Sequence, residues 1–171
     1  AIGYLKDHAT NHAAQPFFLY LAFISPHFPL HAPPEDIARY RDYYLEGWDS
    51  VREQRWQRLR RMKLLDYALP PLDPKFTPRY FKPEVMDTLG PGEAEHPVPW
   101  ETLTTEQKAF QATKMAIHAA MVHRMDLEIG RVLEQIRAMG QFDNTLVMFS
   151  SDNGPWLPKG KDAGTAGPLR G

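Results

Sequence analysis

Two short stretches of the sequence carry side chains that could do chemistry. His27 stands in the proline-rich residues 25–34, and Asp152 and Asn153 follow 125 residues further along the chain. Carboxylate and amide oxygens are hard ligands that suit Ca²⁺ or Mg²⁺. An imidazole beside such an ion can hydrogen-bond an anion or donate a proton. The sequence therefore predicts a cation site with a neighbouring acid, provided that the two stretches meet.

The same residues also have ordinary structural interpretations. An Asp-Asn-Gly triplet is a common turn, and a single histidine in a proline-rich loop is commonly a surface residue. We interpret His31 as structural or as lining the rim of the site, and His118 and His123 as solvent-facing or packed residues of a long helix. The functional interpretation of His27 and Asp152–Asn153 thus depends on the elements that position them.

Each chemical stretch follows an uninterrupted apolar run of strand length. Residues 17–24 read FFLYLAFI and residues 145–150 read TLVMFS. Such runs are typical of strands buried on both faces, as in a parallel sheet covered by helices. Ligands bind at the carboxyl ends of the strands in open α/β sheets, and parallel strands share that edge. We therefore expect His27 and the Asp152–Asn153 pair to lie on one rim.

Helices are expected between the two strands. Pro34, followed by two acidic residues, predicts a helix that runs to about Tyr44. A second helix is expected from Trp48 to about Leu65, with one apolar face and one face rich in arginine. Residues 70–100 are proline-rich and non-periodic, which is typical of a functional loop or of one that wraps over a surface.

The clearest helix begins at Thr104. Thr104 and Gln107 form a capping box, and Gly140 is expected to end the helix in the left-handed conformation. Between them, apolar residues recur every three or four positions and predict a long amphipathic helix. This stripe consists of Ile117, Met121, Met125, Ile129, Val132 and Ile136.

The amino-acid composition limits the classes of function that the chain can have. With 20 Lys and Arg against 21 Asp and Glu, the net charge of −1 argues against a general polyanion binder. The sequence has no cysteine, so it holds no disulfide, thiolate zinc site or cysteine nucleophile. It has no apolar run long enough for a transmembrane helix. Without an initiator methionine, and ending in a Gly- and Pro-rich stretch, it is expected to be an internal fragment.

Three stretches together resemble the sulfatase family. Residues 16–34, PFFLYLAFISPHFPLHAPP, are similar to its strand and Pro-His-x-Pro loop. Residues 121–154, MVHRMDLEIGRVLEQIRAMGQFDNTLVMFSSDNG, resemble its long helix, turn, strand and Ser-Asp-Asn-Gly loop. Residues 35–65 look like the arylsulfatase-type insertion, and we assign residues 46–103 to an insertion-like helical and Pro-rich segment. The resemblance makes residues 1–171 the central part of a single sulfatase catalytic domain, truncated at both ends.

The resemblance implies a fold and a set of residue roles. The fold would be α/β and alkaline-phosphatase-like, with a mixed, mainly parallel sheet flanked by helices. Asp152 and Asn153 match two ligands of a single Ca²⁺. His27 matches the histidine that binds the sulfate ester and protonates the leaving alcohol. The family's formylglycine nucleophile arises in a Cys/Ser-x-Pro-x-Arg motif that this sequence lacks, so it is expected outside the fragment.

The resemblance further implies partners and a location. The substrate would be a small-molecule or carbohydrate sulfate ester, and the remainder of the same polypeptide would complete the site. No nucleic-acid partner and no membrane span are expected, and the family implies a periplasmic or secreted protein. A catalytic lysine is expected just beyond Leu169-Arg170-Gly171, and Lys159 and Lys161 come too early for it. The fragment alone is expected to be inactive.

Two other functions stay open on the sequence. One is a phosphate ester hydrolase of the alkaline phosphatase superfamily, although an Asp-Asn pair favours one hard cation because Asn is a poor zinc ligand. The other is a non-enzymatic module that binds acidic polymers through an arginine-rich helix. Its cations are Arg52, Arg55, Arg58, Arg60, Arg61 and Lys63.

Overall fold

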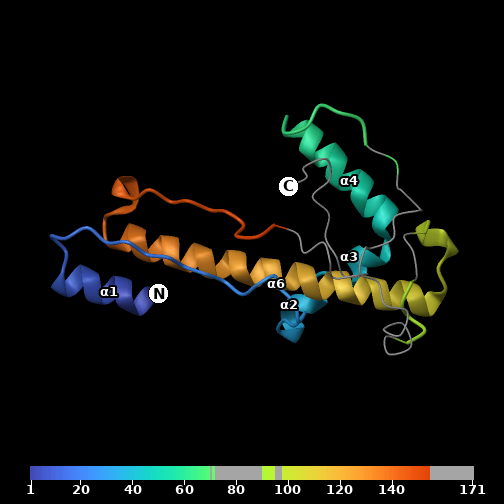
Figure 1. The fold of residues 1–171 in the computed structure, drawn as a ribbon, viewed down its shortest axis with the longest axis horizontal. Coiled ribbons are helices and arrows are strands. Elements are labelled where there is room, and N and C mark those ends of the chain that lie inside the picture. The colour runs from blue at the N-terminus through green and yellow to red at the C-terminus, as the bar shows by residue number, and fades with distance from the viewer. Residues whose placement is uncertain (70, 72–89, 95–97, 155–171) are drawn as a thin grey trace. The chain divides into compact units, whose positions relative to one another are not determined.

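The computed structural model describes residues 1–69, 71, 90–94 and 98–154 (Figure 1). The described elements, in chain order, are α1 (Ile2–Asn11), α2 (Pro34–Ala38), α3 (Arg41–Leu45), α4 (Trp48–Arg61), the 3-10 helix η1 (Trp100–Thr102), α6 (Thr105–Ala138) and the 3-10 helix η2 (Phe142–Asn144). None of the described helices has the length and apolarity needed to cross a lipid bilayer. The chain divides into two units, Ala1–Tyr40 with Ala116–Phe149 and Arg41–Met115 with Ser150–Gly171.

The long helix α6 forms where the sequence predicts it, and its two ends confirm the predicted signals. The Thr104 backbone N–H donates to Gln107 Oε1 at 3.0 Å, and the Gln107 N–H donates to Thr104 Oγ1 at 3.2 Å, which is a complete capping box. Gly140 follows the helix with φ +69°, a left-handed conformation that glycine adopts without steric cost. Local signals thus define this helix.

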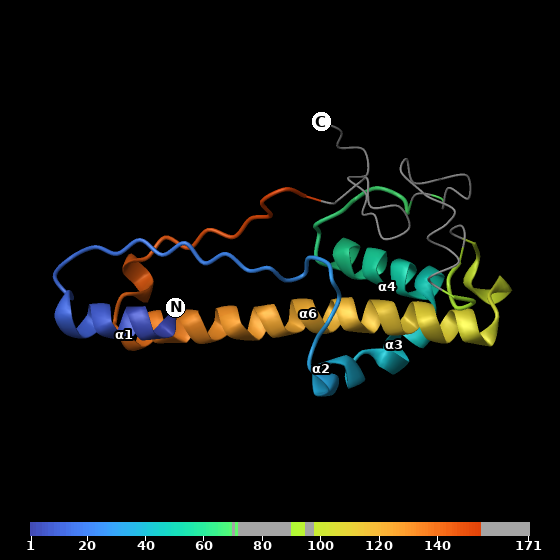
Figure 2. The ribbon, with the colours of Figure 1, turned by 60° about the horizontal axis from the view of Figure 1, so that its bottom comes forward.

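The core of the first unit lies on the apolar stripe of α6. Val132 and Ile136 are buried against Leu5 of α1, and the half-buried Phe17 and Leu19 pack on the same cluster. Figure 2 shows α1 and the extended segment that follows it running along α6. Other stripe residues are buried or half-buried as predicted, namely Met121, Ile117, Met125 and Ile129.

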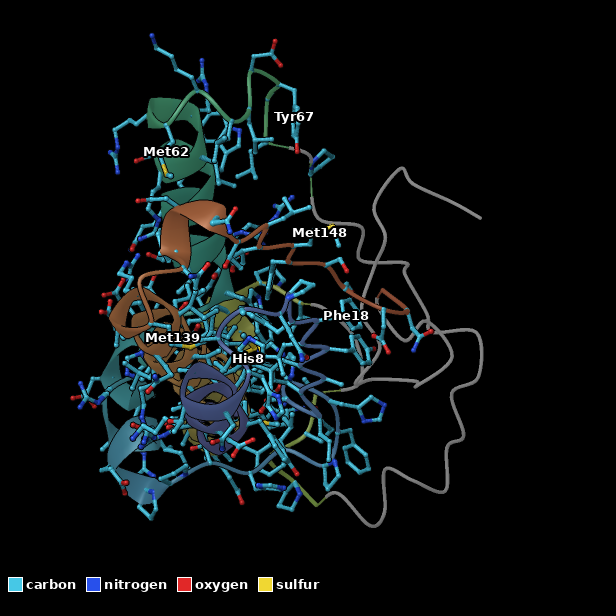
Figure 3. All side chains as sticks on the ribbon, turned by 90° about the vertical axis from the view of Figure 1, so that its left-hand side faces the viewer. His8, Phe18, Met62, Tyr67, Met139 and Met148 are labelled. Carbon is cyan, nitrogen blue, oxygen red and sulfur yellow. The ribbon has the colours of Figure 1, made fainter. Side chains whose placement is uncertain are left out.

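The two predicted strands are not strands in the described part of the chain. Residues 17–24 and 145–150 are extended, and no ladder of backbone hydrogen bonds is formed by either among the described residues. Phe17 and Leu19 face α6, whereas the alternate residues Phe18 and Tyr20 are 89% and 78% exposed. Figure 3 shows Phe18 and Met148 projecting away from the helix.

The difference from the predicted α/β sheet has a physical reason. An apolar run predicts an extended, buried chain, but a strand exists only when a neighbouring strand pairs with its backbone. Here α6, whose own backbone groups are bonded within the helix, covers one side of residues 17–19. The expected mainly parallel sheet is therefore wrong for the described residues, whose regular elements are all helices.

In the second unit, residues 47–49 contact residues 98–100. The Trp48 indole N–H donates to the Val98 carbonyl at 2.9 Å, and the Trp100 N–H donates to Asp49 Oδ2 at 2.9 Å. Trp48 and Trp100 rings meet edge to face, 5.0 Å between centroids. Gly47 has φ +88°, and a side chain there would collide with the Trp100 ring. These contacts join two stretches that are about fifty residues apart.

Two predicted helices differ in extent from the observed ones. The helix expected from Pro34 to Tyr44 is two short helices, α2 and α3, separated by residues 39–40. The helix expected from Trp48 to Leu65 ends at Arg61, and Lys63 follows with φ +58°. Lysine rarely adopts that conformation, which stops a helix.

Candidate active site

His27 lies in the loop between the first extended segment and α2. Its backbone N–H donates to the Ile24 carbonyl at 2.9 Å, which makes a tight turn, and the peptide bonds before Pro26 and Pro29 are cis. Nδ1 of the ring lies 2.6 Å from the Phe28 carbonyl oxygen, and because a carbonyl can only accept, Nδ1 carries the hydrogen. Nε2 is the other nitrogen of this exposed ring.

The end of the His27 loop is anchored by an ion pair whose carboxylate is buried. Asp36 lies in the first turn of α2 and is only 2% exposed. Its Oδ2 accepts hydrogen bonds from Arg124 Nε at 2.8 Å and Nη2 at 2.7 Å, a two-point contact on a single carboxylate oxygen. This contact joins residues 88 positions apart and fixes α2, which begins seven residues after His27, to α6.

Asp152 and Asn153 lie at the end of the second extended segment. Asp152 Oδ1 accepts from the Asn153 backbone N–H at 2.8 Å, and Oδ2 accepts from the Asn153 side-chain Nδ2 at 2.8 Å. The Gly154 N–H donates to Ser151 Oγ at 3.1 Å. The exposed carboxylate and the adjacent amide oxygen are the donor types that Ca²⁺ or Mg²⁺ takes.

The donor chemistry fits a divalent cation, but these two residues supply only part of a coordination shell. Ca²⁺ takes six to eight oxygen ligands. Among the described residues, no three His, Asp or Glu side chains lie close enough together to hold a metal ion. Further ligands for a cation at Asp152 and Asn153 would therefore come from elsewhere.

The predicted meeting of His27 with Asp152 and Asn153 stays a prediction. His27 belongs to the first unit, and Asp152 and Asn153 belong to the second. The Leu169-Arg170-Gly171 segment, Lys159 and Lys161 lie outside the described residues, as does most of the proline-rich segment 70–100.

A buried polar cluster at the start of α6 was missed by the sequence analysis. Glu93 is 6% exposed, and its carboxylate accepts from Lys114 Nζ at 2.7 Å, Gln111 Nε2 at 2.7 Å and the Ala94 N–H at 3.0 Å. Burial raises the pKa of the Glu93 carboxyl, but the bonds from Lys114, Gln111 and Ala94 outweigh burial and hold the pKa below its ordinary value. No sequence pattern links Glu93 to helix residues about twenty positions later.

His118, on α6, is a second titratable group with an altered proton affinity. Burial lowers the pKa of its imidazole, because the charged form loses solvation. His123, on the same helix, packs its ring edge-on against Tyr40 at 5.8 Å between centroids. Both histidines are thus packed residues, one of the two interpretations that the sequence left open.

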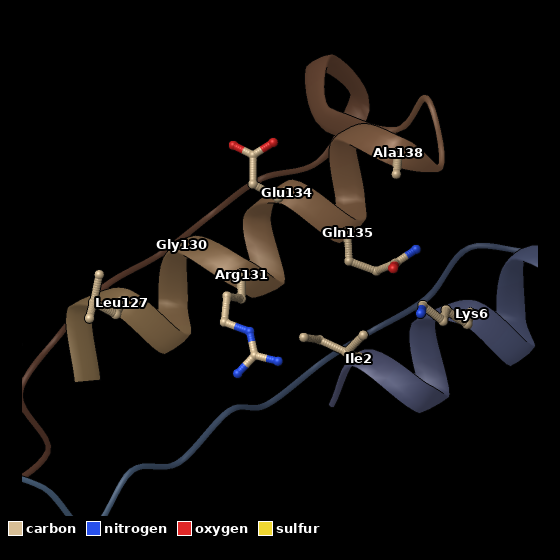
Figure 4. A pocket seen from close by; sticks show the side chains of 8 residues that line it. All are labelled: Ile2, Lys6, Leu127, Gly130, Arg131, Glu134, Gln135 and Ala138. Atoms are coloured by element: carbon tan, nitrogen blue, oxygen red, sulfur yellow. The ribbon is translucent and has the colours of Figure 1, made fainter. Parts of the chain in front are cut away.

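The open hollows among the described residues include two that are lined by helix residues. Figure 4 shows one of about 540 Å³ between α1 and α6, into which Ile2 and Lys6 from α1 and Arg131 and Gln135 from α6 project. The other, of about 380 Å³, lies on α4. Neither is lined by His27, Asp152 or Asn153.

Comparison with known proteins decides the family. The profile of the family described as Sulfatase matches residues 1–169. The chain belongs to the sulfatase family. The family implies an alkaline-phosphatase-like α/β fold for a whole domain, while the described residues of this sulfatase chain are helical.

Curated relatives show what this sulfatase chain is similar to. It is 40% identical over 141 residues to an uncharacterized sulfatase of Schizosaccharomyces pombe, with 82% of this chain and 22% of that protein covered. It is 36% identical over 142 residues to an arylsulfatase of Klebsiella aerogenes, covering 82% and 26%. It is 31% identical over 159 residues to human N-sulphoglucosamine sulphohydrolase, covering 91% and 25%. The chain spans about a quarter of the length of these relatives.

Proposed function

We propose that the protein containing this sulfatase chain hydrolyses sulfate monoesters, with His27 as general acid and Asp152 and Asn153 as ligands of one Ca²⁺. The observation that carries the proposal is the family match over residues 1–169, which includes the whole His27 loop and the Ser-Asp-Asn-Gly loop. The relatives named arylsulfatase and N-sulphoglucosamine sulphohydrolase support sulfate ester chemistry in general.

The tautomer of His27 suits an acid. With Nδ1–H held by the Phe28 carbonyl, protonation of the ring adds its hydrogen at Nε2. The imidazolium then donates that proton to the ester oxygen as the bond from sulfur to oxygen breaks, so the product leaves as an alcohol. Proton donation of this kind contributes about 10²–10⁴-fold to a rate.

Asp152 and Asn153 would hold the cation through the carboxylate and the side-chain carbonyl oxygen. The cation supplies stabilisation of negative charge on the sulfate oxygens, a large term in reactions of this class. The hydrogen bond that Asn153 Nδ2 donates to Asp152 Oδ2 orients the two side chains relative to each other. Two further carboxylates and the formylglycine nucleophile are expected outside this chain, and the 171 residues alone are expected to be inactive.

The substrate is proposed to be an aryl or carbohydrate sulfate. Residues 70–100, the proline-rich segment, are proposed to help select between them. A periplasmic or secreted location follows from the family and not from any feature of these residues. A phosphate ester hydrolase is the competing function, and the pairing of an acid with an amide at residues 152–153 favours a hard cation over zinc.

The test measures hydrolysis of 4-nitrophenyl sulfate and 4-nitrophenyl phosphate by the full-length protein, together with its bound calcium. We expect the sulfate to be the better substrate and Asp152→Ala to lose both calcium and activity. The activity loss should be on the order of 10⁴-fold, because the metal contributes several kcal/mol and each 1.4 kcal/mol is a factor of ten.

Asp143→Ala is the matched control, because Asp143 is another exposed aspartate, in η2. It should leave calcium content and turnover unchanged. Faster hydrolysis of the phosphate ester, or full activity in Asp152→Ala, would overturn the proposed function.

A further inference from the structure

The arginines of α4 form an unusual surface for a chain with almost no net charge. Residues 52–63 carry six cationic side chains against one carboxylate, Glu53. We name the exposed arginines Arg55, Arg58, Arg60 and Arg61, together with Trp56 and Gln57, the α4 basic face. The whole chain has a net charge of −1, so this positive charge is local.

The arginines of the α4 basic face differ from those of α6 in their partners. Arg124, Arg131 and Arg137 of α6 each pair with a carboxylate within 4 Å. No arginine of the α4 basic face is paired with a carboxylate of the described residues. Unpaired guanidinium groups keep their capacity for bidentate hydrogen bonds to an anion.

The α4 basic face also borders an open hollow that Trp56 helps to line. The hollow of about 380 Å³ is lined by Trp56, Gln57, Arg60 and Arg61. The Trp56 indole N–H donates to the Tyr67 carbonyl at 2.9 Å, and the Arg60 guanidinium lies 4.9 Å from the centroid of the indole ring. Tyr67 lies just beyond the C-terminal end of α4 (Figure 3). The indole and the Arg60 side chain are thus oriented before any ligand binds.

We propose that the α4 basic face is an accessory binding site for a sulfated polysaccharide. Guanidinium groups recognise the oxygens of sulfate groups, and the half-buried Trp56 offers an apolar edge to a sugar ring. The site rests on the proposed function, because it would hold a polymer whose sulfate esters the enzyme cleaves elsewhere. The four arginines are spread over residues 55–61, about 9 Å along the helix axis, which is long enough for more than one sulfate of a polymer to contact α4.

A nucleic acid fits these observations less well than a sulfated sugar chain. Nucleic-acid binding rests on a broad positive surface, whereas the cationic side chains of the α4 basic face are confined to that helix, in a nearly neutral sequence. The hollow on α4 holds a single aromatic ring, whereas single-stranded nucleic acids are bound by several rings on which successive bases stack. Nucleic-acid binding is therefore an outcome that the experiment must exclude.

The experiment measures binding of a heparin-derived octasaccharide to the full-length protein by titration calorimetry. We expect the double variant Arg60→Gln/Arg61→Gln to weaken the octasaccharide about tenfold, since each exposed charge contact is modest and two are lost. Trp56→Phe should weaken it by a smaller factor. The desulfated octasaccharide should bind at least tenfold more weakly than the sulfated one.

A matched control removes the same charge from α6. Arg131→Gln/Arg137→Gln also deletes two exposed arginines, both of them ion-paired, and should leave octasaccharide binding within about twofold. Turnover of 4-nitrophenyl sulfate should be unchanged in both double variants. The KM for a sulfated polymer should rise only in the α4 variant.

Three results would overturn the site. They are equal octasaccharide affinity in the wild type and the α4 variant, an equal loss in the α6 control, and a single-stranded oligonucleotide of the same charge binding more tightly than the octasaccharide. Failure of the proposed function is separate, because it shows as absent turnover of 4-nitrophenyl sulfate while the binding measurements still decide the site.

Discussion

Two kinds of charged or titratable residue occur in this sulfatase chain. The carboxylates of Asp36 and Glu93 are buried, and each is bonded by a cation of α6 that is 88 or 21 positions away in sequence. The His27 ring and the Asp152 carboxylate are exposed and bond groups of the very next residue. Each buried carboxylate joins remote parts of its own unit, whereas each exposed group bonds its neighbour in the sequence.

The difference in burial separates residues that contribute to stability from residues that are proposed to contribute to activity. A buried carboxylate is tolerable only with its partners in place, so removing either partner costs folding free energy. An exposed side chain that bonds its neighbour contributes little to folding, because water can replace that bond. Variants at the buried pair should therefore lower stability, and variants at the exposed pair should lower activity with stability preserved.

After Asp152→Ala, the largest effect is expected from His27→Ala in the full-length enzyme. It should reduce kcat about 10³-fold for alkyl sulfates, because their poor leaving groups need a proton. The reduction should be much smaller for 4-nitrophenyl sulfate, whose leaving group is stable as an anion. Steady-state kinetics with a series of leaving groups measures this difference directly.

The control for this variant is His12→Ala, which removes another exposed histidine of the same unit. It should leave kcat unchanged for every ester. An equal reduction by His27→Ala for alkyl and aryl esters would contradict the general-acid role. A drop in thermal stability that accounts for the lost activity would contradict the claim that exposed residues contribute little to stability.

The next effect is expected from Arg124→Gln. It leaves the Asp36 carboxylate buried without its two-point partner, and the remaining cation, Arg39, lies 3.9 Å away. The free energy of unfolding should fall by about 3 kcal/mol. Urea denaturation measures the change.

Arg131→Gln is the matched control for Arg124→Gln. Arg131 is 65% exposed and pairs with Glu128 on the surface of the same helix. Surface pairs contribute little, so this variant should change the free energy of unfolding by about 0.5 kcal/mol or less. Equal losses for the two variants would show that the Asp36 contact is an ordinary surface pair.

Elements with local signals could be predicted from the sequence. The capping box of Thr104 and Gln107, the glycine at 140 and the proline at 34 each act within a few residues, and each is found where predicted. The apolar runs at 17–24 and 145–150 predicted extended chain, but strand pairing depends on a neighbour that the run itself does not specify. That is why the extended conformation is confirmed, whereas the strand pairing is absent from the part of the chain that the structure describes.

The candidate site likewise contains residues that could be predicted from the sequence and contacts that could not. His27 and Asp152–Asn153 could be selected from their residue types and their places after apolar runs. The bonds of Asp36 with Arg124 and of Glu93 with Lys114 could not be predicted, because they join residues of different elements without a shared motif. Residue type therefore indicates candidate chemistry, whereas the buried partners become known only with the tertiary structure.

The smallest effect is expected from Glu93→Gln, and pH separates it from a general loss of stability. At pH 7 the free energy of unfolding should fall by about 1–2 kcal/mol, because glutamine keeps one acceptor oxygen but loses the charge that Lys114 faces.

The folded state lowers the Glu93 pKa, so its stabilisation is complete above the ordinary value of 4.5 and is lost as pH falls through the folded value. Burial likewise lowers the His118 pKa, so stability falls as pH drops below 6.5. The wild type should thus lose stability in two stages on acidification, and Glu93→Gln should keep the stage that begins near 6.5 while losing part of the one below 4.5. Urea midpoints measured from pH 7 to pH 3 give both profiles. If the two profiles run parallel over the whole range, the buried carboxylate of Glu93 adds no charge-dependent stability, and burial alone does not distinguish it from the exposed residues.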